Sequence, residues 1–442
     1  MPKLRSPRLR KAHPVQALMF FALGWVCFVD PPIVYKADLT WYFAVLLLLP
    51  IASLYTRRWV FLAPAEFVCS LGFLFALMLA GVLSDHTVKA LIYSAKLAFS
   101  LLFLWPLIRS NLTYFTWLIR GIAALVAVNF ILLILHLVAG TPTALLHAGD
   151  RWSTPLSSIG IIGVPAAFVF SYYLTQSIMI RLRPRGVLLA TAGLTVAVAS
   201  GSRGVIILCV MALAAACLAV FLGRPVSRMY RLAALAVLAC VAFAIVARRE
   251  IVGSTVLSDR VANFFDTSTG MDDDRLNAED PLRYRMLQLA TDAIRNHPIK
   301  GTGLLTLALP AEGGAMQVIH NRYLGAWAEL GLLGFVSLLG ILLSWVPDWW
   351  GTLRRRRLVT SLNDRFHLLW TSLALAQFLA FGLFFPIGVQ ISDWVIFLLA
   401  VTQFRRAAVR PKIQMPGRRP RLVSREPAAR PALTATRAGV MS

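Results

Sequence analysis

Apolar runs long enough to cross a lipid bilayer recur along the whole chain, and no other feature of the sequence restricts the fold as strongly. A helix that crosses a bilayer needs roughly 20 apolar residues. Apolar residues make up 58% of the 442 positions and charged residues only 14%, too few to cover the surface of a soluble helical protein of this length. The runs lie at residues 14–29, 39–55, 59–83, 88–108, 112–139, 155–180, 187–200, 204–222, 230–247, 321–346, 366–386 and 388–404.

This pattern predicts an all-α, polytopic membrane protein of about twelve transmembrane helices. The chain then divides into four parts. Residues 1–247 hold helices one to nine, 248–320 form one large, partly helical loop, 321–404 hold the last three helices, and 405–442 form a basic, disordered tail.

The distribution of Lys and Arg predicts the orientation of the helices. Basic residues gather on the cytoplasmic loops of membrane proteins. If the amino terminus is inside, most of the Lys and Arg residues fall on cytoplasmic segments, both termini are cytoplasmic, and 248–320 faces the periplasm of a bacterial inner membrane. The net charge of +24 is therefore a topology signal, and the tail from Arg405 suits anionic membrane lipids. Nucleic-acid binding is not predicted, because the charge is spread over many short loops.

The loop at 248–320 is too long for a simple connection, and long loops in compact folds are often functional or disordered. Asp280-Pro281 is typical of a helix start, with Asp as the cap and Pro at the first helical position. Apolar residues at helical spacing continue to Asn296. His297-Pro298 is expected to end this helix, and Gly301-Thr302-Gly303 predicts a turn. The acidic run 272–274 is interpreted as a solvated tip, with a calcium site as a less favoured alternative.

Neither a metal site nor a cofactor is predicted, because the seven histidines are scattered and no HxxxH or CxxC motif occurs. The candidate chemistry therefore lies with basic residues at the outward edge. Arg203 stands in Ser200-Gly201-Ser202-Arg203-Gly204, a tight turn whose free N–H groups suit an anion. Its alternative role is contact with lipid headgroups.

Three further positions complete the candidate set. Arg285 projects from the loop helix, where Leu289 on the same face is able to dock that helix on the membrane domain, but an exposed helix charge is an equal interpretation. His320 precedes Asn321 at the outer mouth of a predicted span and suits a general base; a helix-entry His without a role is the alternative. Arg151 offers another phosphate contact or simply pairs with Asp150.

Lys89 and Lys96 share one face of a predicted span. They face either the bundle interior or the interface, and Lys96, deep in the span, is a candidate partner for an internal charge.

One mechanism unites these side chains. Arginine forks bind diphosphate oxygens in a bidentate manner, and neutralising a diphosphate eases its departure. A histidine base then takes the proton of an attacking hydroxyl.

Several motifs resemble those of bacterial O-antigen ligases. His320-Asn321 is followed by the glycine pair Gly331 and Gly334 at the spacing of that family. The pair Arg285 and Leu289 resembles its Arg-x-x-x-Leu element, the segment 298–303 matches its Pro-apolar-x-Gly-x-Gly pattern, and 202–204 resembles its Ser-Arg-Gly turn. These motifs cover roughly 200–335 in the family's order. Pro155 departs from the family, in which an Asn-containing segment often begins the span.

The resemblance implies a membrane glycosyltransferase, GT-C-like and inverting, that needs neither metal nor ATP. Such ligases transfer O-antigen from undecaprenyl diphosphate to the lipid A–core oligosaccharide at the periplasmic face. By resemblance His320 activates or orients the acceptor, Arg203 and Arg285 hold the diphosphate, and Arg151 is a further contact. Asn321, Leu289, Gly331 and Gly334 support the site.

Three alternatives remain. An O-antigen polymerase uses the same donor, although many polymerases have two sizeable outward loops. A protein O-oligosaccharyltransferase usually has a longer C-terminal region. A transporter or lipid flippase would bind an anionic lipid without catalysis, but the sequence has no internal repeat of the kind that transporters show.

Overall fold

The computed structural model describes residues 13–29, 60–140, 145–147, 151–156, 159–180, 183–221, 281–310, 316–354, 362–387 and 391–413. Two of the predicted runs, 39–55 and 230–247, lie outside these residues. So do the acidic run 272–274 and the tail beyond residue 413.

Within the described residues, the regular structure consists of helices and two short hairpins. Several helices begin with a proline, whose fixed φ suits the first helical position. The helices are α1 (Pro14–Val26), α3 (Pro64–Val82), α4 (Thr87–Phe99), the π-helical turn η2 (Ser100–Leu104), α5 (Trp105–Ser110), the 3-10 turn η3 (Leu112–Tyr114), α6 (Phe115–Ala139), α7 (Ile159–Met179), α8 (Pro184–Ala199), α9 (Arg203–Phe221), α14 (Pro281–Asn296), α15 (Arg322–Leu343), α16 (Val346–Arg354), α17 (Leu362–Phe381) and α18 (Ile391–Ile413). The antiparallel strands are β1 (Leu145–His147) with β2 (Arg151–Ser153), and β3 (Leu309–Pro310) with β4 (Met316–Gln317).

Every predicted apolar run within the described residues coincides with a helix, so the chain is a helical membrane protein. Five helical stretches are long and apolar enough to cross a membrane: Pro64–Val82, Thr87–Ser110, Leu112–His136, Ile162–Met179 and Arg322–Thr352. The total of twelve spans and the GT-C-like architecture stay predictions. Two local differences appear. α7 begins at Ile159 and not at Pro155, and a further helix, α16, starts where the predicted run 321–346 ends.

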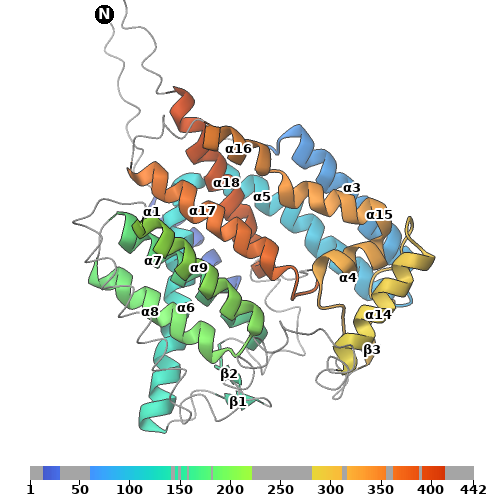
Figure 1. Cartoon of the computed structure of the whole chain (residues 1–442), viewed down its shortest axis with the longest axis horizontal. Helices are drawn as coiled ribbons and strands as arrows, with labels where there is room; N and C mark the ends of the chain where they lie inside the picture. Colours follow the sequence, from blue (N-terminus) through green and yellow to red (C-terminus); the bar gives the residue numbers. More distant parts are fainter. Residues whose placement is uncertain are drawn as a thin grey trace, which may run out of the picture.

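The helices form one bundle in which segments distant in sequence pack together (Figure 1). α15 packs on α3, α1 on α6, and α17 on α7, α9 and α18. Trp370 of α17, fully buried, lies in edge contact with Phe115, Phe168 and Tyr172, at ring-centroid distances of 5.5, 5.3 and 5.1 Å. Aromatic pairs of this geometry add to the packing.

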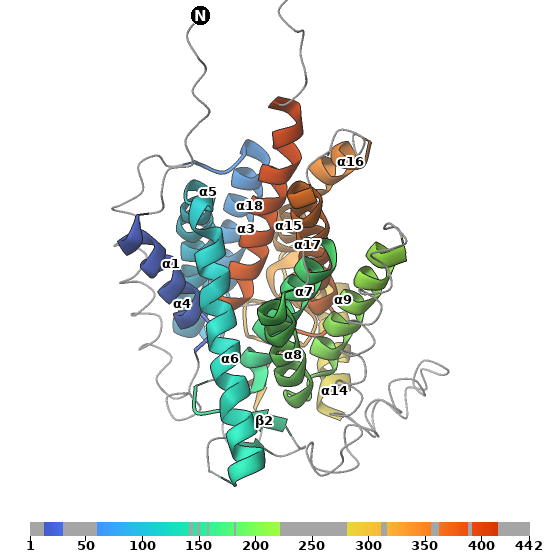
Figure 2. The same ribbon diagram turned by 90° about the vertical axis from the view of Figure 1, so that its left-hand side faces the viewer.

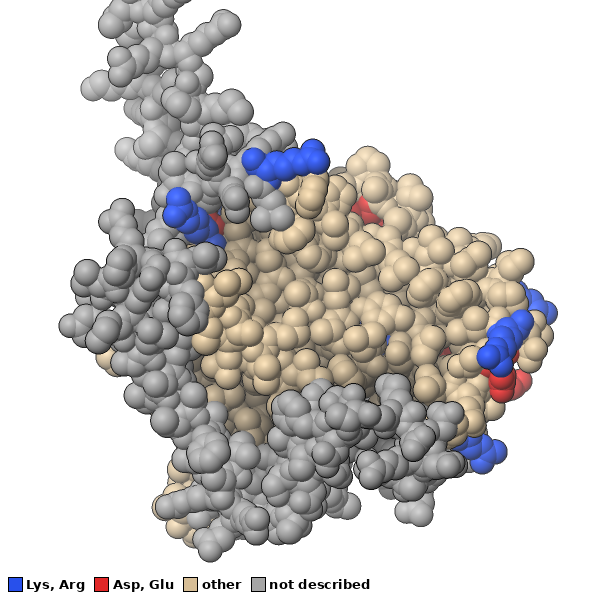
Figure 3. Space-filling view, in the orientation of Figure 1, with Lys and Arg blue, Asp and Glu red and all other residues tan. Residues whose placement is uncertain are grey.

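The bundle has two distinct ends. α1 begins and α18 finishes at one end, whereas the β1–β2 hairpin and α14 lie at the other (Figures 1 and 2). We call the second one the loop end; within the described residues it comprises 83–87, 145–147, 151–156, 200–203, 297–310, 316–320 and 382–387. In Figure 3 Lys and Arg side chains gather at the upper edge and over α14, and a broad uncharged face lies between them. This division suits a protein whose middle faces lipid.

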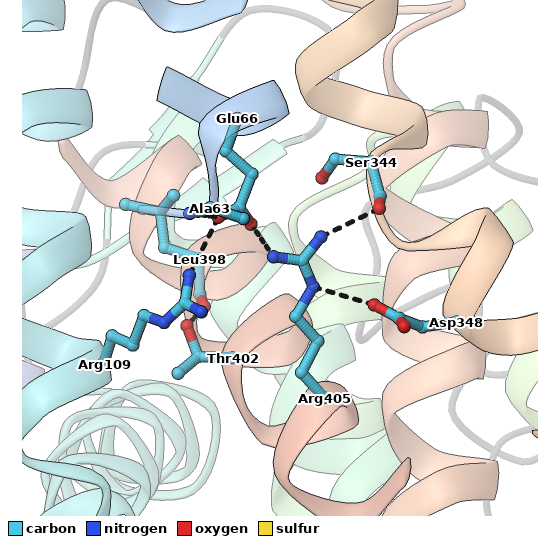
Figure 4. A network of polar contacts seen from close by, with 8 residues as sticks. All are labelled: Ala63, Glu66, Arg109, Ser344, Asp348, Leu398, Thr402 and Arg405. Atoms are coloured by element: carbon cyan, nitrogen blue, oxygen red, sulfur yellow. Dashed lines mark hydrogen bonds and ion pairs between the residues drawn. The ribbon is translucent and has the colours of Figure 1, made fainter. Parts of the chain in front are cut away.

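A buried ionic network ties the helices together at the end opposite the loop end (Figure 4). Glu66 of α3 is 1% exposed and pairs with Arg109 of α5, at 2.8 Å, and with Arg405 of α18. Arg405 also contacts Asp348 of α16, at 3.1 Å, and donates to the backbone carbonyl of Ser344, at 2.8 Å. The Glu66 carboxylate therefore joins α3, α5 and α18, and Arg405 extends the network to α16.

Candidate functional site at the loop end

His320 and Asn321 lie at the beginning of α15. The Asn321 side chain caps the helix, accepting the backbone N–H groups of Tyr323 and Leu324 at 3.0 Å each. His320 is half-buried, and its Nδ1 lies 2.7 Å from the Val318 carbonyl oxygen. Because a carbonyl oxygen only accepts, Nδ1 carries the proton in the neutral ring, and Nε2 carries the lone pair. This is the tautomer that a base acting through Nε2 requires.

α15 breaks at Gly331, ten residues beyond its cap. Gly331 has φ 70° and ψ −172°, which interrupts the helical hydrogen bonds. Loop residues satisfy the backbone groups on both sides of the break. Thr302 N–H donates to the Ala328 carbonyl at 2.9 Å, Gly303 N–H to the Glu329 carbonyl at 3.1 Å, and Leu332 N–H to the Pro298 carbonyl at 3.0 Å.

The loop segment 298–303 therefore docks directly in the break of α15. A Cβ added at Gly331 would lie 2.1 Å from the Ile299 carbonyl oxygen, and one added at Gly301 would lie 2.5 Å from the Glu329 carbonyl oxygen. Neither position has room for a side chain. A Cβ added at Gly334 would lie 2.3 Å from the Leu330 Cβ of the same helix and 3.3 Å from Ala76 of α3. Gly301 and Gly331 are therefore needed where two backbones meet, and Gly334 lies where Leu330 and α3 leave little room.

The same loop reaches α3. Leu304 N–H donates to the Ala80 carbonyl at 3.0 Å, and the Ser84 hydroxyl donates to the Leu304 carbonyl. The next residue, Leu305, has a φ of 64°, unusual for a residue with a branched side chain. The side chain of Glu329 is buried, and its backbone carbonyl accepts the Gly303 N–H, so this residue helps to hold the loop in place.

α14 carries Arg285 and packs beside His320. Met286, Ala290 and Ala293 of α14 form a buried cluster with Ile319 and Ala328, and Leu289 lies against it. The predicted docking face of this helix and its end near His297 are confirmed. The Arg285 side chain is exposed, and the next residue, Met286, is buried in this cluster. Ile319, also in the cluster, directly precedes His320, so the cluster lies beside both candidate residues.

Arg203 is the first residue of α9, directly after the predicted tight turn. Gly201 adopts a φ of 61°, and its N–H donates to the Val198 carbonyl at 2.9 Å, which closes the turn. The neighbouring Gly204 packs closely on the end of α17: a Cβ there would lie 3.3 Å from Phe385 and 3.4 Å from Phe384. The backbone of Arg203 is therefore at the loop end, beside residues 381–385.

The segment 378–387 also contacts the start of α15. Arg322 N–H donates to the Gly382 carbonyl at 2.8 Å, and the Tyr323 hydroxyl donates to the Leu379 carbonyl at 2.7 Å. The end of α17 therefore stands between the Arg203 turn on one side and the His320 segment on the other. This element was absent from the site predicted from sequence.

Arg151 lies in β2, where its backbone pairs with His147. Its hairpin is at the same end of the bundle as the turn before α9 (Figures 1 and 2). Thr154, just after β2, contacts the buried Asn129 of α6 through its hydroxyl, which anchors the hairpin. The backbone of Arg151 therefore lies at the loop end, as do the backbones of the other candidates.

The two lysines of α4 differ in exposure. Lys89 is exposed, and Lys96 is half-buried with its ammonium 5.4 Å from the centre of the Tyr93 ring. Within the described part of the chain, no group of three His, Cys, Asp or Glu side chains is placed to hold a metal ion.

Arg203, Arg285 and His320 thus lie on elements that meet at one end of the bundle, although their functional roles stay predictions. Sequence reasoning missed Arg322 and Glu329, both buried in α15. The signal was available, since an ionisable residue inside an apolar span is costly and usually has a specific role.

A family model described as O-antigen ligase matches residues 186–339, from α8 through the turn at Arg203, α14 and His320 to the glycine pair of α15. No curated protein matches the chain. Residues 186–339 are therefore a domain of the O-antigen ligase/polymerase superfamily of glycosyltransferase-like membrane enzymes, as the sequence motifs predict.

Proposed function

We propose that the protein is an O-antigen ligase of a bacterial inner membrane. It transfers O-antigen polysaccharide from undecaprenyl diphosphate to a sugar hydroxyl of lipid A–core, at the periplasmic face. The observation that carries the proposal is the convergence of the Arg203 turn, α14 with Arg285, and the His320 segment at the loop end, inside the range that the family model matches.

In this reaction the acceptor hydroxyl oxygen forms a bond to the anomeric carbon of the donor sugar. The bond between that carbon and the diphosphate oxygen breaks, and its electron pair leaves with undecaprenyl diphosphate. Attack from the face opposite the leaving group inverts the configuration. The acceptor proton goes to Nε2 of His320, the nitrogen that the contact between Nδ1 and Val318 leaves as the acceptor.

Arg203 and Arg285 hold the diphosphate in this proposal, and Arg151 is a further contact. Guanidinium groups bind phosphate oxygens through paired hydrogen bonds. As the diphosphate leaves, its developing charge is stabilised by groups already in place. Arg203 lies on α9, which packs against α17, and Arg285 lies on α14, which docks on α15. Both arginines therefore have a rigid backbone.

Deletion of the gene tests the biological role. Loss of a ligase is expected to leave bare lipid A–core, with polymerised glycan stranded on the lipid carrier. Core that carries a single repeat unit would instead identify a polymerase. Donor trapped on the cytoplasmic side would identify a flippase, and loss of glycan from proteins alone would identify a protein O-oligosaccharyltransferase.

Substitution of His320 tests the catalytic assignment. We expect His320→Ala to abolish glycan transfer in the deletion strain while the protein still accumulates in the membrane. His297→Ala is the matched control, because His297 is exposed on the same loop at the end of α14. Wild-type lipopolysaccharide from the His320→Ala variant would remove His320 from the mechanism.

A further inference from the structure

Arg322 is a fully buried arginine beside the proposed site. It is 1% exposed and is among the largest fully buried side chains of the described residues. A buried guanidinium is costly unless the surrounding groups compensate for its lost hydration. The proposed mechanism gives Arg322 no role, although only Asn321 separates it from His320.

Three contacts join Arg322 to the end of α17 and the residues that follow. The backbone N–H of Arg322 donates to the Gly382 carbonyl at 2.8 Å, and Nε makes a longer hydrogen bond of 3.4 Å to the Pro386 carbonyl. The guanidinium carbon lies 4.4 Å from the centre of the Phe378 ring. Both a cation–π contact and a carbonyl acceptor suit a planar guanidinium.

The segment that Arg322 contacts is the one on which the Arg203 turn rests. Gly204 packs against Phe381, Phe384 and Phe385, which lie between the Phe378 ring and the Pro386 carbonyl in sequence. One continuous segment, 378–386, therefore connects Gly204, the neighbour of Arg203, with Arg322, two residues after His320. Arg322 is the side chain that contacts this segment at both of its ends.

We propose that Arg322 is a positioning residue for the glycan transfer: it clamps the His320 end of α15 to the segment 378–386 and so sets the base against the diphosphate cradle at Arg203. This inference rests on the proposed function. Arg322 does not touch the substrate. Because proximity effects are steep, a displacement of about 1 Å in such a site lowers a rate on the order of a hundredfold.

Two substitutions separate the clamp from its charge. Arg322→Met removes the charge and the Nε–H but keeps an unbranched side chain, and Arg322→Lys keeps the charge but loses the planar group that both stacks and donates. The matched control is Arg120→Met. Arg120 also lies over an aromatic ring, at 4.8 Å from the Trp117 centroid, but it is exposed and sits near the start of α6.

The experiment uses the full chain purified in micelles, with a prenyl-diphosphate-linked glycan and lipid A–core as substrates. Arg322→Met and Arg322→Lys are expected to lower kcat at least about tenfold, with the KM for the lipid-linked donor unchanged. Arg120→Met should keep wild-type kcat. Wild-type kcat in Arg322→Lys overturns the proposal, even if Arg322→Met does not fold. A raised donor KM with unchanged kcat also overturns it, since Arg322 would then bind the donor.

Combination with His320→Gln distinguishes positioning from a general loss of stability. If Arg322 acts through His320, the double variant is about as slow as His320→Gln alone. Multiplied losses would show that Arg322 acts elsewhere. The proposed function has a separate test in the same set: wild-type turnover by His320→Gln overturns the role of the histidine, whereas a slow His320→Gln with an unaffected Arg322→Met overturns only the positioning role.

Discussion

At the scale of single residues, Asn321 supports the histidine that precedes it. Its side chain accepts two backbone N–H groups at 3.0 Å. Asn321→Ala removes that cap, and we expect a loss of about 1 kcal/mol of stability together with slower glycan transfer, because the backbone at His320 loses its anchor. Thermal unfolding in detergent and a transfer assay measure both effects. Asn321→Ser, which retains a capping oxygen, should stay close to wild type; equal losses in the two variants would contradict a capping role.

Residue motifs predicted part of the candidate site and left out another part. His320 and Asn321 were found because they precede an apolar run and stand at a fixed distance from a glycine pair, and Arg285 because it lies on the predicted loop helix. Arg322 was missed because it stands at the edge of an apolar run, where a basic residue normally reaches lipid headgroups. Its burial depends on the Gly382 and Pro386 carbonyls, which lie some 60 residues further along the chain.

At the scale of elements, the break in α15 fixes the loop to the bundle. Gly331→Ala would place a Cβ 2.1 Å from the Ile299 carbonyl oxygen at a positive φ. We expect a cost of about 2 kcal/mol or more, with segment 298–303 displaced from α15. Protease cleavage near this segment and the midpoint of thermal unfolding report the change. Gly351→Ala is the matched control, because nothing lies within 4 Å of its added Cβ. A similar loss of stability in Gly351→Ala would contradict the steric explanation for Gly331.

A buried glutamine joins three helices below the site. Gln377 of α17 donates to the Ser171 hydroxyl of α7 at 2.8 Å and to the Leu208 carbonyl of α9 at 2.6 Å. Gln377→Leu is expected to cost about 1–2 kcal/mol, because it leaves polar partners buried. Adding Ser171→Ala should recover part of that loss, since an apolar pair replaces a broken polar one. Thermal unfolding of the two single variants and the double variant tests this coupling; a further loss in the double variant would contradict it.

Predicted spans located the helices well but could not show the break inside one of them. The run 321–346 has no proline at the point of interruption, and glycine is common in transmembrane helices. The break at Gly331 is stable because loop backbone groups replace the lost helical partners. The partners come from residues 298–303, so the interruption depends on tertiary contact and not on the local sequence.

At the scale of the whole molecule, most charged residues lie at the two ends of the predicted spans, and the few buried ones connect helices. On the predicted topology, most basic residues lie on the cytoplasmic side of the membrane. Glu66 falls inside the predicted apolar run 59–83, yet its carboxylate is the point at which α3, α5 and α18 meet. A count of apolar residues over a window hides a single charged residue. The partners of Glu66 are distant in sequence and become apparent only in the folded structure.

Glu66→Gln tests how strongly this network holds the bundle. The amide keeps the shape of the carboxylate but removes its charge, so Arg109 and Arg405 lose their shared partner in a poorly hydrated place. Loss of one member of a buried ion pair costs about 3–5 kcal/mol, and we expect the lower end because both arginines are partly exposed. The control is Asp292→Asn, whose pair with Arg295 is 4.0 Å long and largely exposed, and is worth about 0–1 kcal/mol. The midpoint of thermal unfolding in detergent measures both variants. Equal midpoints for wild type and Glu66→Gln would mean that apolar packing alone holds the end opposite the loops, and that the three charges make no net contribution to stability.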